Sequence, residues 1–159
     1  MRQRALASGF TLVELMVSLA VLAIGLSLAT PPFQKLIASQ RVKNASFDLY
    51  SALNYARSEA VKRNGNISVK AGALSNGSWA SGWRIDDGTT ILRSWGATSS
   101  LSVSEASSLA TVTYGVDGRL TTVAPRLQVA PAVSLSGVSG RCVRVDLSGR
   151  PSTSNGSCP

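Results

Sequence analysis

The ionisable and nucleophilic side chains of this 159-residue sequence offer little chemistry of their own. The sequence contains no histidine, no glycine-rich phosphate loop before a helix, and no cluster of acids with the spacing of metal ligands. Asp86-Asp87 is its only pair of adjacent carboxylates, and Gly88 directly after the pair is typical of a turn. The sequence therefore predicts a protein that is not an enzyme, with no cofactor and no bound metal.

Glu14 is the acid whose position needs an explanation. It lies in a run from Phe10 to Ala29 that otherwise holds only apolar and small polar residues. About twenty residues of helix span the hydrocarbon core of a bilayer, and a carboxylate inside such a segment costs roughly 2.5–3.5 kcal/mol on insertion. Because the run contains no basic residue, we expect the partner of Glu14 to belong to another molecule. The free amine of a neighbouring chain that has been cut after Gly9 is a candidate.

The two cysteines, Cys142 and Cys158, lie close together near the end of the sequence. Neither belongs to a Cys-x-x-Cys pair and there is no histidine to share a metal, so a disulfide is the simplest interpretation. Closing a loop of roughly fifteen residues should stabilise the fold by about 3 kcal/mol. A lasting disulfide needs an oxidising compartment, which indicates that this part of the chain is periplasmic.

Basic residues outnumber acidic ones, with a formal net charge of +8 and a pI near 10.3. An excess of this size attracts polyanions or anionic membranes without selecting one of them. Arg141, Arg144 and Arg150 lie near one another in the sequence, and arginine side chains suit phosphate recognition. The alternative is that these arginines only keep a sheet edge soluble.

A second helical segment follows the apolar run. Pro31 and Pro32 should kink the helix rather than end it. Beyond them, apolar residues recur at spacings of three and four, which predicts an amphipathic helix over residues 33–64. Charged residues, Glu59 among them, should fall largely off the apolar face, and residues 64–66 (Asn-Gly-Asn) should end the helix. The expected apolar face consists of Val42, Ala45, Leu49, Leu53, Ala56 and Ala60, widened by Phe47 and Tyr50.

Residues 65–159 have the pattern of an antiparallel β domain. Short β-rich runs alternate with clusters of Gly, Ser, Asn and Asp at intervals of roughly ten residues. Hairpin turns are expected at Asp87-Gly88 and Asp117-Gly118. The expected strands are 67–70, 83–85, 90–95, 101–103, 110–114, 120–123, 126–129, 133–135 and 142–147. Few of their side chains are large, so we expect the helix to complete a thin core. We expect Trp79, Trp83 and Trp95 to pack in the core or at a sheet edge rather than to form a binding patch.

The start of the chain resembles the class III signal of type IV pilins and of type II secretion pseudopilins. A short basic leader ends in Gly9 and is followed by Phe-Thr-Leu-Val-Glu-Leu. The resemblance implies that a prepilin peptidase removes residues 1–9 and methylates the amine of Phe10, and that Glu14 supports docking between subunits. It also implies that residues 10–32 form a single-pass segment in the bacterial inner membrane, with the C-terminal domain in the periplasm. The subunit would later enter a pilus or pseudopilus.

Several later segments resemble the GspH and FimT/FimU group of minor pilins and pseudopilins. They are residues 53–63, 82–88, 113–119, 142–145 and 148–150, together with Cys158. The resemblance implies an α+β pilin-like fold, in which a long N-terminal helix, its first half transmembrane, packs on a C-terminal antiparallel β domain. It implies a minor pilin that contributes to type IV pilus assembly, priming or the fibre tip, with other minor pilins and the major pilin as partners. A minor pseudopilin of a type II secretion system, with pseudopilins as partners, is the alternative.

A further alternative is a minor pilin that binds DNA for DNA uptake. Some FimT-like relatives take part in this process through a basic C-terminal motif of the form Gly-Arg-x-Arg. Residues 149–152 here are Gly-Arg-Pro-Ser, so the second arginine of the motif is missing. We therefore favour the solubilising role for Arg141, Arg144 and Arg150, and we expect any DNA binding to be weak.

Overall fold

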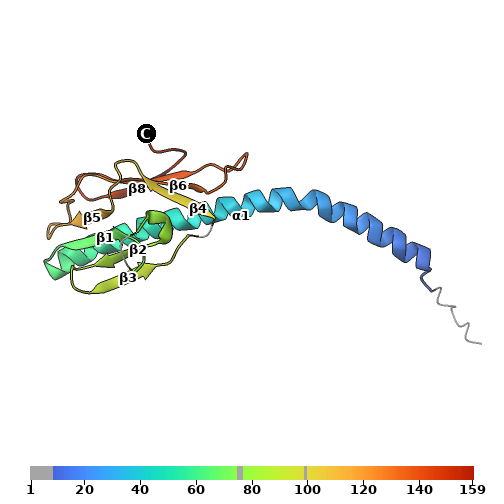
Figure 1. The fold of residues 1–159 in the computed structure, drawn as a ribbon, viewed down its shortest axis with the longest axis horizontal. Coiled ribbons are helices and arrows are strands. Elements are labelled where there is room, and N and C mark those ends of the chain that lie inside the picture. The colour runs from blue at the N-terminus through green and yellow to red at the C-terminus, as the bar shows by residue number, and fades with distance from the viewer. Residues whose placement is uncertain (1–8, 75–76, 99) are drawn as a thin grey trace, which may run out of the picture.

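A long N-terminal helix joined to a small β domain makes up the fold (Figure 1). The structure, a computed structural model, describes residues 9–74, 77–98 and 100–159, and of residues 27–32 it describes the helical backbone only. The helix, α1, runs over Leu12–Arg63 and contains 52 residues. Its N-terminal half projects away from the domain, whereas its C-terminal half lies against the strands. Residues 1–8 of the predicted leader lie outside the described residues.

Capping groups define both ends of α1. Thr11 is the N-cap, and its side chain accepts the backbone N–H of Glu14. Asn64 is the C-cap and adopts the left-handed conformation, with φ 50°, while its N–H donates to carbonyl oxygens of the last helical turn. The predicted end of the helix at residues 64–66 is confirmed.

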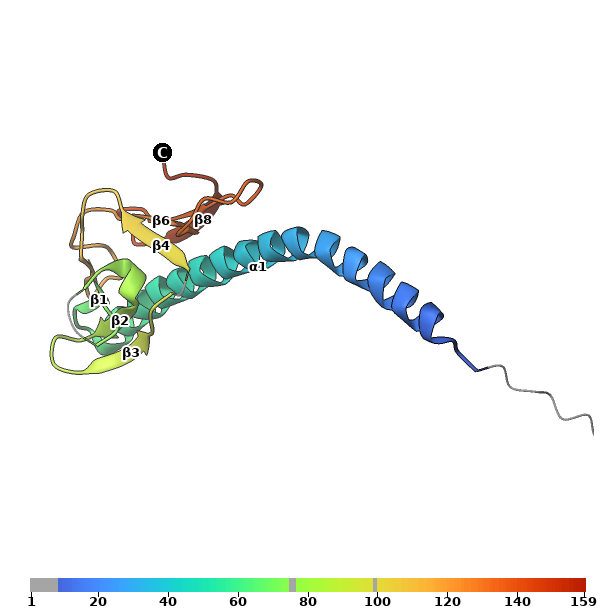
Figure 2. The same ribbon diagram turned by 45° about the vertical axis from the view of Figure 1, so that its right-hand side comes forward.

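The helix continues through Pro31 and Pro32 without a break. Figure 2 shows that α1 bends in its light-blue part, N-terminal to the segment that packs on the domain. Proline removes a backbone donor and its ring crowds the preceding turn, so bending is the usual response of a helix that contains it. The assignment of the bend to these two prolines stays a prediction.

The C-terminal half of α1 buries the face that the sequence predicted. Ala52 and Ser46 are buried as well. The six residues expected on this face are all buried: Val42, Ala45, Leu49, Leu53, Ala56 and Ala60. Two predictions about this face were wrong. Phe47 is 67% exposed, because it lies two residues, or about 200° of helical rotation, from the buried Leu49. Glu59 is buried, because it precedes Ala60 on the flank of the apolar face, where Arg63 neutralises it.

Within the described residues, eight strands form two four-stranded antiparallel sheets. The strands are β1 (Ile67–Ala71), β2 (Trp83–Asp86), β3 (Ile91–Trp95), β4 (Leu101–Glu105), β5 (Thr111–Tyr114), β6 (Arg126–Pro131), β7 (Arg141–Val145) and β8 (Pro151–Asn155). The strand order is β3-β2-β1-β5 in the first sheet and β4-β6-β7-β8 in the second. A short 3-10 helix, η1 (Trp79–Ser81), precedes β2. α1 contacts strands of both sheets, so the core lies between the helix and the two sheets.

Three predictions about strands were wrong. Residues 120–123 form no strand, and Leu120 makes only an isolated bridge with Tyr114. Residues 133–135 lie in the loop between β6 and β7, where Val133 has no partner strand and is 75% exposed. Residues 151–155 were not predicted but form β8, whose polar side chains are mostly exposed. Backbone pairing with β7, rather than side-chain burial, keeps this strand in place.

The tryptophans and the first of the two turns follow the sequence predictions. Trp79 and Trp83 are buried, and Trp95 is partly buried with its ring stacked on that of Trp83 at 6.2 Å between centroids. Packing, rather than a surface patch, is therefore confirmed for them. Gly88 and Gly118 have φ of 94° and 72°, a conformation that favours glycine. The hairpin turn at Asp87-Gly88 is confirmed between β2 and β3, whereas the turn at Asp117-Gly118 is closed only by the isolated bridge of Tyr114 with Leu120.

Candidate functional site

Two regions contain most of the residues that the sequence predicts to be functional: the start of α1 and the second sheet with its C-terminal segment. At the start of α1, Gly9 and Phe10 precede the first helical residue, and the Phe10 side chain is 74% exposed. The predicted cleavage site therefore lies in non-helical, exposed chain. A peptidase needs such a segment, because a helix would have to unfold before its backbone could enter an active site.

Glu14 is held by Thr11 in a capping box at the start of the helix. The Glu14 Oε2 atom accepts the backbone N–H of Thr11 at 2.9 Å and the Thr11 hydroxyl at 2.9 Å, while Thr11 Oγ1 accepts the Glu14 N–H at 3.2 Å. Sequence reasoning assigned the partner of Glu14 to another molecule and missed this one inside the chain. The Thr-x-x-Glu spacing at the start of an apolar run was the signal that could have shown it.

The N-terminal half of α1 presents apolar side chains on its whole circumference. Each exposes more than half of its surface: Leu12, Val13, Leu15, Met16, Val17, Leu19, Val21, Leu22, Ile24 and Leu26. An exposed apolar surface of this extent marks a segment that is covered in its working environment. In the part of the chain that the structure describes, no helix is both long and apolar enough to cross a membrane.

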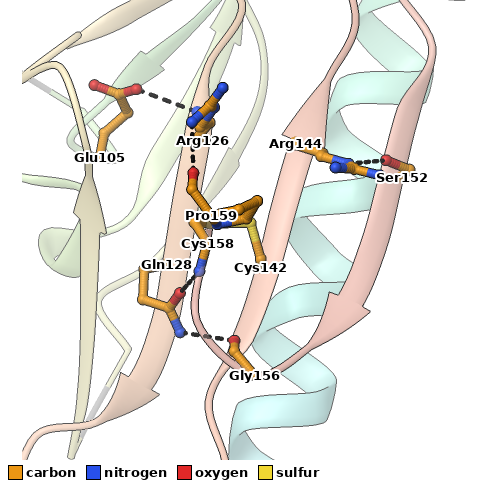
Figure 3. The surroundings of a disulfide bond; sticks show 9 residues. All are labelled: Glu105, Arg126, Gln128, Cys142, Arg144, Ser152, Gly156, Cys158 and Pro159. Atoms are coloured by element: carbon orange, nitrogen blue, oxygen red, sulfur yellow. Dashed lines mark hydrogen bonds between the residues drawn. A yellow bond between two sulfur atoms is a disulfide. The ribbon is translucent and has the colours of Figure 1, made fainter.

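A disulfide fastens the C-terminal segment to the outer face of the second sheet. Cys142 of β7 and Cys158 are joined, with Cα atoms 4.9 Å apart. The side-chain amide of Gln128 in β6 makes two hydrogen bonds to the same segment. Its Oε1 accepts the Cys158 N–H at 2.6 Å, and its Nε2 donates to Gly156 O at 3.2 Å. Figure 3 shows these contacts from the side opposite α1, which passes behind β7 and β8.

The structure places Arg141 and Arg144, two of the three arginines that the sequence grouped, on opposite faces of β7. Arg141 and Arg144 are three residues apart on β7, an odd spacing that places side chains on opposite faces of a strand. Arg144 Nε donates to Ser152 Oγ at 3.3 Å, and Arg141 Nη2 to Thr153 Oγ1 at 3.4 Å. Arg150 lies in the turn before β8. The structure therefore does not gather these three guanidinium groups into one cluster.

Arg126 of β6 is the basic residue that sequence reasoning missed. The register of the sheet pairs Arg126 with Arg144, so both side chains leave the same face of neighbouring strands. A hollow of about 290 Å³ lies beside them, lined also by Ala124, Val145, Asp146, Ser152 and Pro159. No signal in the sequence could have found this pair, because the partner of β7 depends on the order of strands in the folded sheet.

The paired carboxylates Asp86 and Asp87 serve the fold. Asp86 is buried and binds Lys70 at 2.8 Å and Arg84 at 3.4 Å. Asp87 accepts the backbone N–H groups of residues 89 and 90 in the hairpin turn, which lowers its pKa to about 2. Elsewhere in the described residues, no three histidine, cysteine or acidic side chains lie together as metal ligands would.

Comparison with known families accounts for this combination of helix and β domain. The family model described as type II transport protein GspH matches residues 45–149, which comprise the packed half of α1 and most of the β domain. The chain belongs to the GspH family. A second model, the prokaryotic N-terminal methylation motif, matches residues 4–30. The GspH-family chain thus carries an N-terminal methylation motif ahead of its packed domain.

Solved structures agree with this assignment. One crystal form (P21) of the Pseudomonas aeruginosa PAO1 type IV minor pilin FimU is 25% identical, with a TM-score of 0.62 over 72% of this chain and 89% of that one. A second form (P65) is 26% identical, with a TM-score of 0.59 over 70% and 91%. Among curated proteins, no significant sequence relative is found. The α+β pilin fold and a minor pilin or pseudopilin role are therefore shown, in a family of structural subunits.

Proposed function

We propose that this GspH-family chain is a minor pilin of a type IV pilus that contributes to pilus assembly, priming or the fibre tip. The observation that carries the proposal is the similarity of its packed domain to two crystal forms of a type IV minor pilin. The adjacent carboxylates Asp86 and Asp87 stabilise a strand and a hairpin turn, which is a structural role rather than a catalytic one. We infer that it has no enzymatic activity.

The exposed half of α1 supports an anchoring and assembly role. Burying apolar surface yields about 25 cal/mol per Å², so a helix that is apolar on its whole circumference gains from any apolar surrounding. Residues 10–32 lie in the inner membrane as a single pass before assembly, with the domain in the periplasm. Afterwards the helices of other minor pilins and of the major pilin cover them.

Processing of the leader prepares the N-terminus for this assembly. The prepilin peptidase cuts between Gly9 and Phe10 and methylates the Phe10 amine, at an exposed site before the helix. Both Thr11 bonds to the Glu14 carboxylate go to Oε2, and Oε1 has no hydrogen-bond partner within the described residues. Oε1 is therefore free to accept the N-terminal amine of a neighbouring subunit, which is the docking role of Glu14.

Deletion of the gene in the native host tests this function. We expect loss or strong reduction of surface fibres, restored by the wild-type chain, and we expect the chain to be present in purified sheared fibres. Normal fibres together with a defect in protein secretion would instead assign the chain to a type II pseudopilus. The observation that supports this second candidate is the description of the matching family as a type II transport protein.

DNA binding through Arg141, Arg144 and Arg150 stays a prediction with a separate test. We expect at most weak, sequence-independent retardation of duplex DNA, with binding that decreases steeply as salt is raised. Ser152→Arg, which restores the missing second arginine of the motif, should strengthen it. If neither protein retards DNA at low salt, the chain has no nucleic-acid role.

A further inference from the structure

The loop between β6 and β7 presents apolar side chains outside the core of the domain. Its residues, 132–140, include no charged side chain. Val133 is 75% exposed, whereas Leu135 is half-buried. The Val138 N–H donates to the Leu135 carbonyl oxygen at 3.0 Å, which closes a tight turn in which Gly137 has φ of 86°. The loop therefore has a defined conformation that keeps Val133 in solvent.

The loop extends toward the N-terminal half of α1. In both views it lies at the end of the domain from which that half of the helix projects (Figure 1 and Figure 2). A groove of about 430 Å³ lies between the loop and the helix, and Val133 and Leu135 line its domain side. One face of α1 lines the opposite side: Gln34, Ile37, Ala38 and Arg41. The loop therefore reaches along α1 as far as Gln34.

The position of Gln34 on α1 places the loop close to the bilayer that holds the apolar half of the helix. Between Leu12, the first helical residue, and Gln34 the helix extends over about 33 Å. The hydrocarbon core of a bilayer is about 30 Å thick, and the headgroup layers bring the total to about 40–45 Å. When the apolar run that begins at Leu12 fills the core, Gln34 and the loop beside it lie at the level of the headgroups.

Exposed basic residues accompany the apolar ones at this level of α1. Residues 33–47 contain no acid, and three basic residues among them are exposed: Lys35, Arg41 and Lys43. The apolar side chains of Phe33, Leu36 and Ile37 are each at least 50% exposed. Anionic headgroups attract basic residues that adjoin a membrane segment, and interfacial segments combine such residues with apolar ones. The groove and its surroundings therefore match the chemistry of a lipid–water interface.

We propose that the loop of residues 132–140 docks on the headgroup layer of the membrane that holds α1, with Val133 inserted among the lipids, until the subunit enters a fibre. The proposal rests on the proposed function and names an anionic bilayer as the partner of this surface. The helix anchors the domain at one point, and the loop adds a second that fixes the tilt of the domain against the bilayer. Burial of a single valine contributes little compared with the apolar half of α1, so the loop can leave the membrane when assembly begins.

Methyl NMR of the full chain, labelled on valine and leucine and placed in nanodiscs with one chain per disc, tests the contact. The discs contain phosphatidylethanolamine and phosphatidylglycerol, with or without a lipid that carries a nitroxide near the headgroup end of its acyl chain. We expect the nitroxide to weaken the methyl signals of Val133 and Leu135 several-fold, because its unpaired electron broadens only nearby signals.

Val116 is the matched control, because it is also a loop valine and is 48% exposed. Its loop lies beside the C-terminal end of α1, where Gly118 O accepts the Arg57 Nε–H at 3.1 Å. About 35 Å of helix separates Arg57 from Gln34, so the Val116 signal should keep its intensity. Equal weakening of Val133 and Val116, or no weakening of Val133, would overturn the proposal.

The variant Val133→Asp tests whether an apolar contact holds the loop. A carboxylate is unfavourable at an anionic interface, so the variant should lift the loop and reduce the weakening at Leu135 several-fold. Val116→Asp adds the same charge at the far end of the domain and should leave Leu135 as in the wild type. Both replaced side chains are exposed, so the signals of the buried Leu53 should stay unchanged in both variants. Undiminished weakening of Leu135 in Val133→Asp would contradict the proposal.

Two further observations separate the alternatives. Changes at Val133 that appear only in discs holding several chains would assign the groove to another copy and overturn the lipid contact. The Leu22 methyl signals report on the anchor itself. If the nitroxide leaves them unchanged, the membrane placement of α1 in the proposed function fails, and this proposal fails with it. Weakened Leu22 signals beside an unchanged Val133 would overturn the loop contact alone.

Discussion

The two halves of α1 belong to one continuous helix but have opposite surroundings. The C-terminal half places small residues, such as Ala52, Ala56 and Ala60, against the sheets and buries them completely. The N-terminal half exposes large ones, such as Leu15 and Leu22, each by more than half. These alanines, together with the larger Leu49 and Leu53, pack within one molecule, whereas the exposed side chains of the N-terminal half provide apolar surface for something outside it. The C-terminal half of α1 therefore contributes to folding, whereas the N-terminal half is available for assembly.

A leucine substitution in each half should give the largest contrast. Leu53→Ala removes a fully buried side chain and should lower the free energy of unfolding by about 2–5 kcal/mol. Leu22→Ala, the matched control, removes a 58% exposed side chain and should change it by less than about 0.5 kcal/mol. Denaturant unfolding of the full chain in mild detergent, followed by tryptophan fluorescence, measures both. Similar losses in the two variants would show that the halves are not energetically distinct.

Loss of the disulfide should have the next largest effect, again confined to the packed region. Replacing Cys142 and Cys158 together by serine should lower the free energy of unfolding by about 2–4 kcal/mol, because the unfolded chain regains freedom in the opened loop. A reducing agent should destabilise the wild type by a similar amount and leave the double variant unaffected. Two alkylatable thiols in natively prepared protein would contradict both this prediction and the periplasmic placement.

Glu14→Ala should have the converse effect and impair assembly alone. The variant loses the capping box and the carboxylate that we assign to docking, so its incorporation into fibres should drop several-fold while domain unfolding stays unchanged. Ser18→Ala is the matched control, because Ser18 donates to the Glu14 carbonyl one turn further on without adding charge. Wild-type incorporation of the Glu14 variant would show that the carboxylate has no docking role.

The smallest expected effect is a decrease in domain stability at acid pH. The side-chain hydrogen bond from Arg63 lowers the pKa of Glu59, and hydrogen bonds from Thr90 and Thr89 in the turn lower the pKa of Asp87 to about 2. Depressed carboxylate pKa values stabilise the fold above the unfolded values, near 4, and this stability is lost as pH falls toward 2. The thermal midpoint should therefore stay level from neutral pH to about 5 and then decrease. In Arg63→Gln the decrease should be shallower, and an equally steep decrease would assign it to other groups.

Local patterns predicted the parts of the fold that depend on local contacts. Apolar spacing identified the buried face of α1, and Asn64 and Gly88 marked a helix end and a turn through their own backbone preferences. The sequence did not predict β8, because its Pro-Ser-Thr-Ser-Asn sequence has little strand propensity and the strand depends on pairing with β7. The sequence wrongly predicted Phe47 on the buried face of α1, because its apolar side chain suggests burial although its position on the helix points it to solvent.

The candidate sites divide in the same way. Gly9, Phe10 and Glu14 belong to one short motif, so the sequence alone could indicate them. The Arg126–Arg144 pair joins residues that are eighteen positions apart through the register of β6 and β7. Register is a property of the folded sheet, so composition could indicate only that the region is basic.

Mass spectrometry of the N-terminus, on chain purified from fibres of the native host, tests the central claim most directly. If the exposed half of α1 serves assembly, the leader before it must be removed, so we predict that the chain starts at Phe10, shortly before α1, and carries a methyl group on its amine. An intact Met1 terminus, or cleavage after the apolar run that ends at Ala29, would contradict the account.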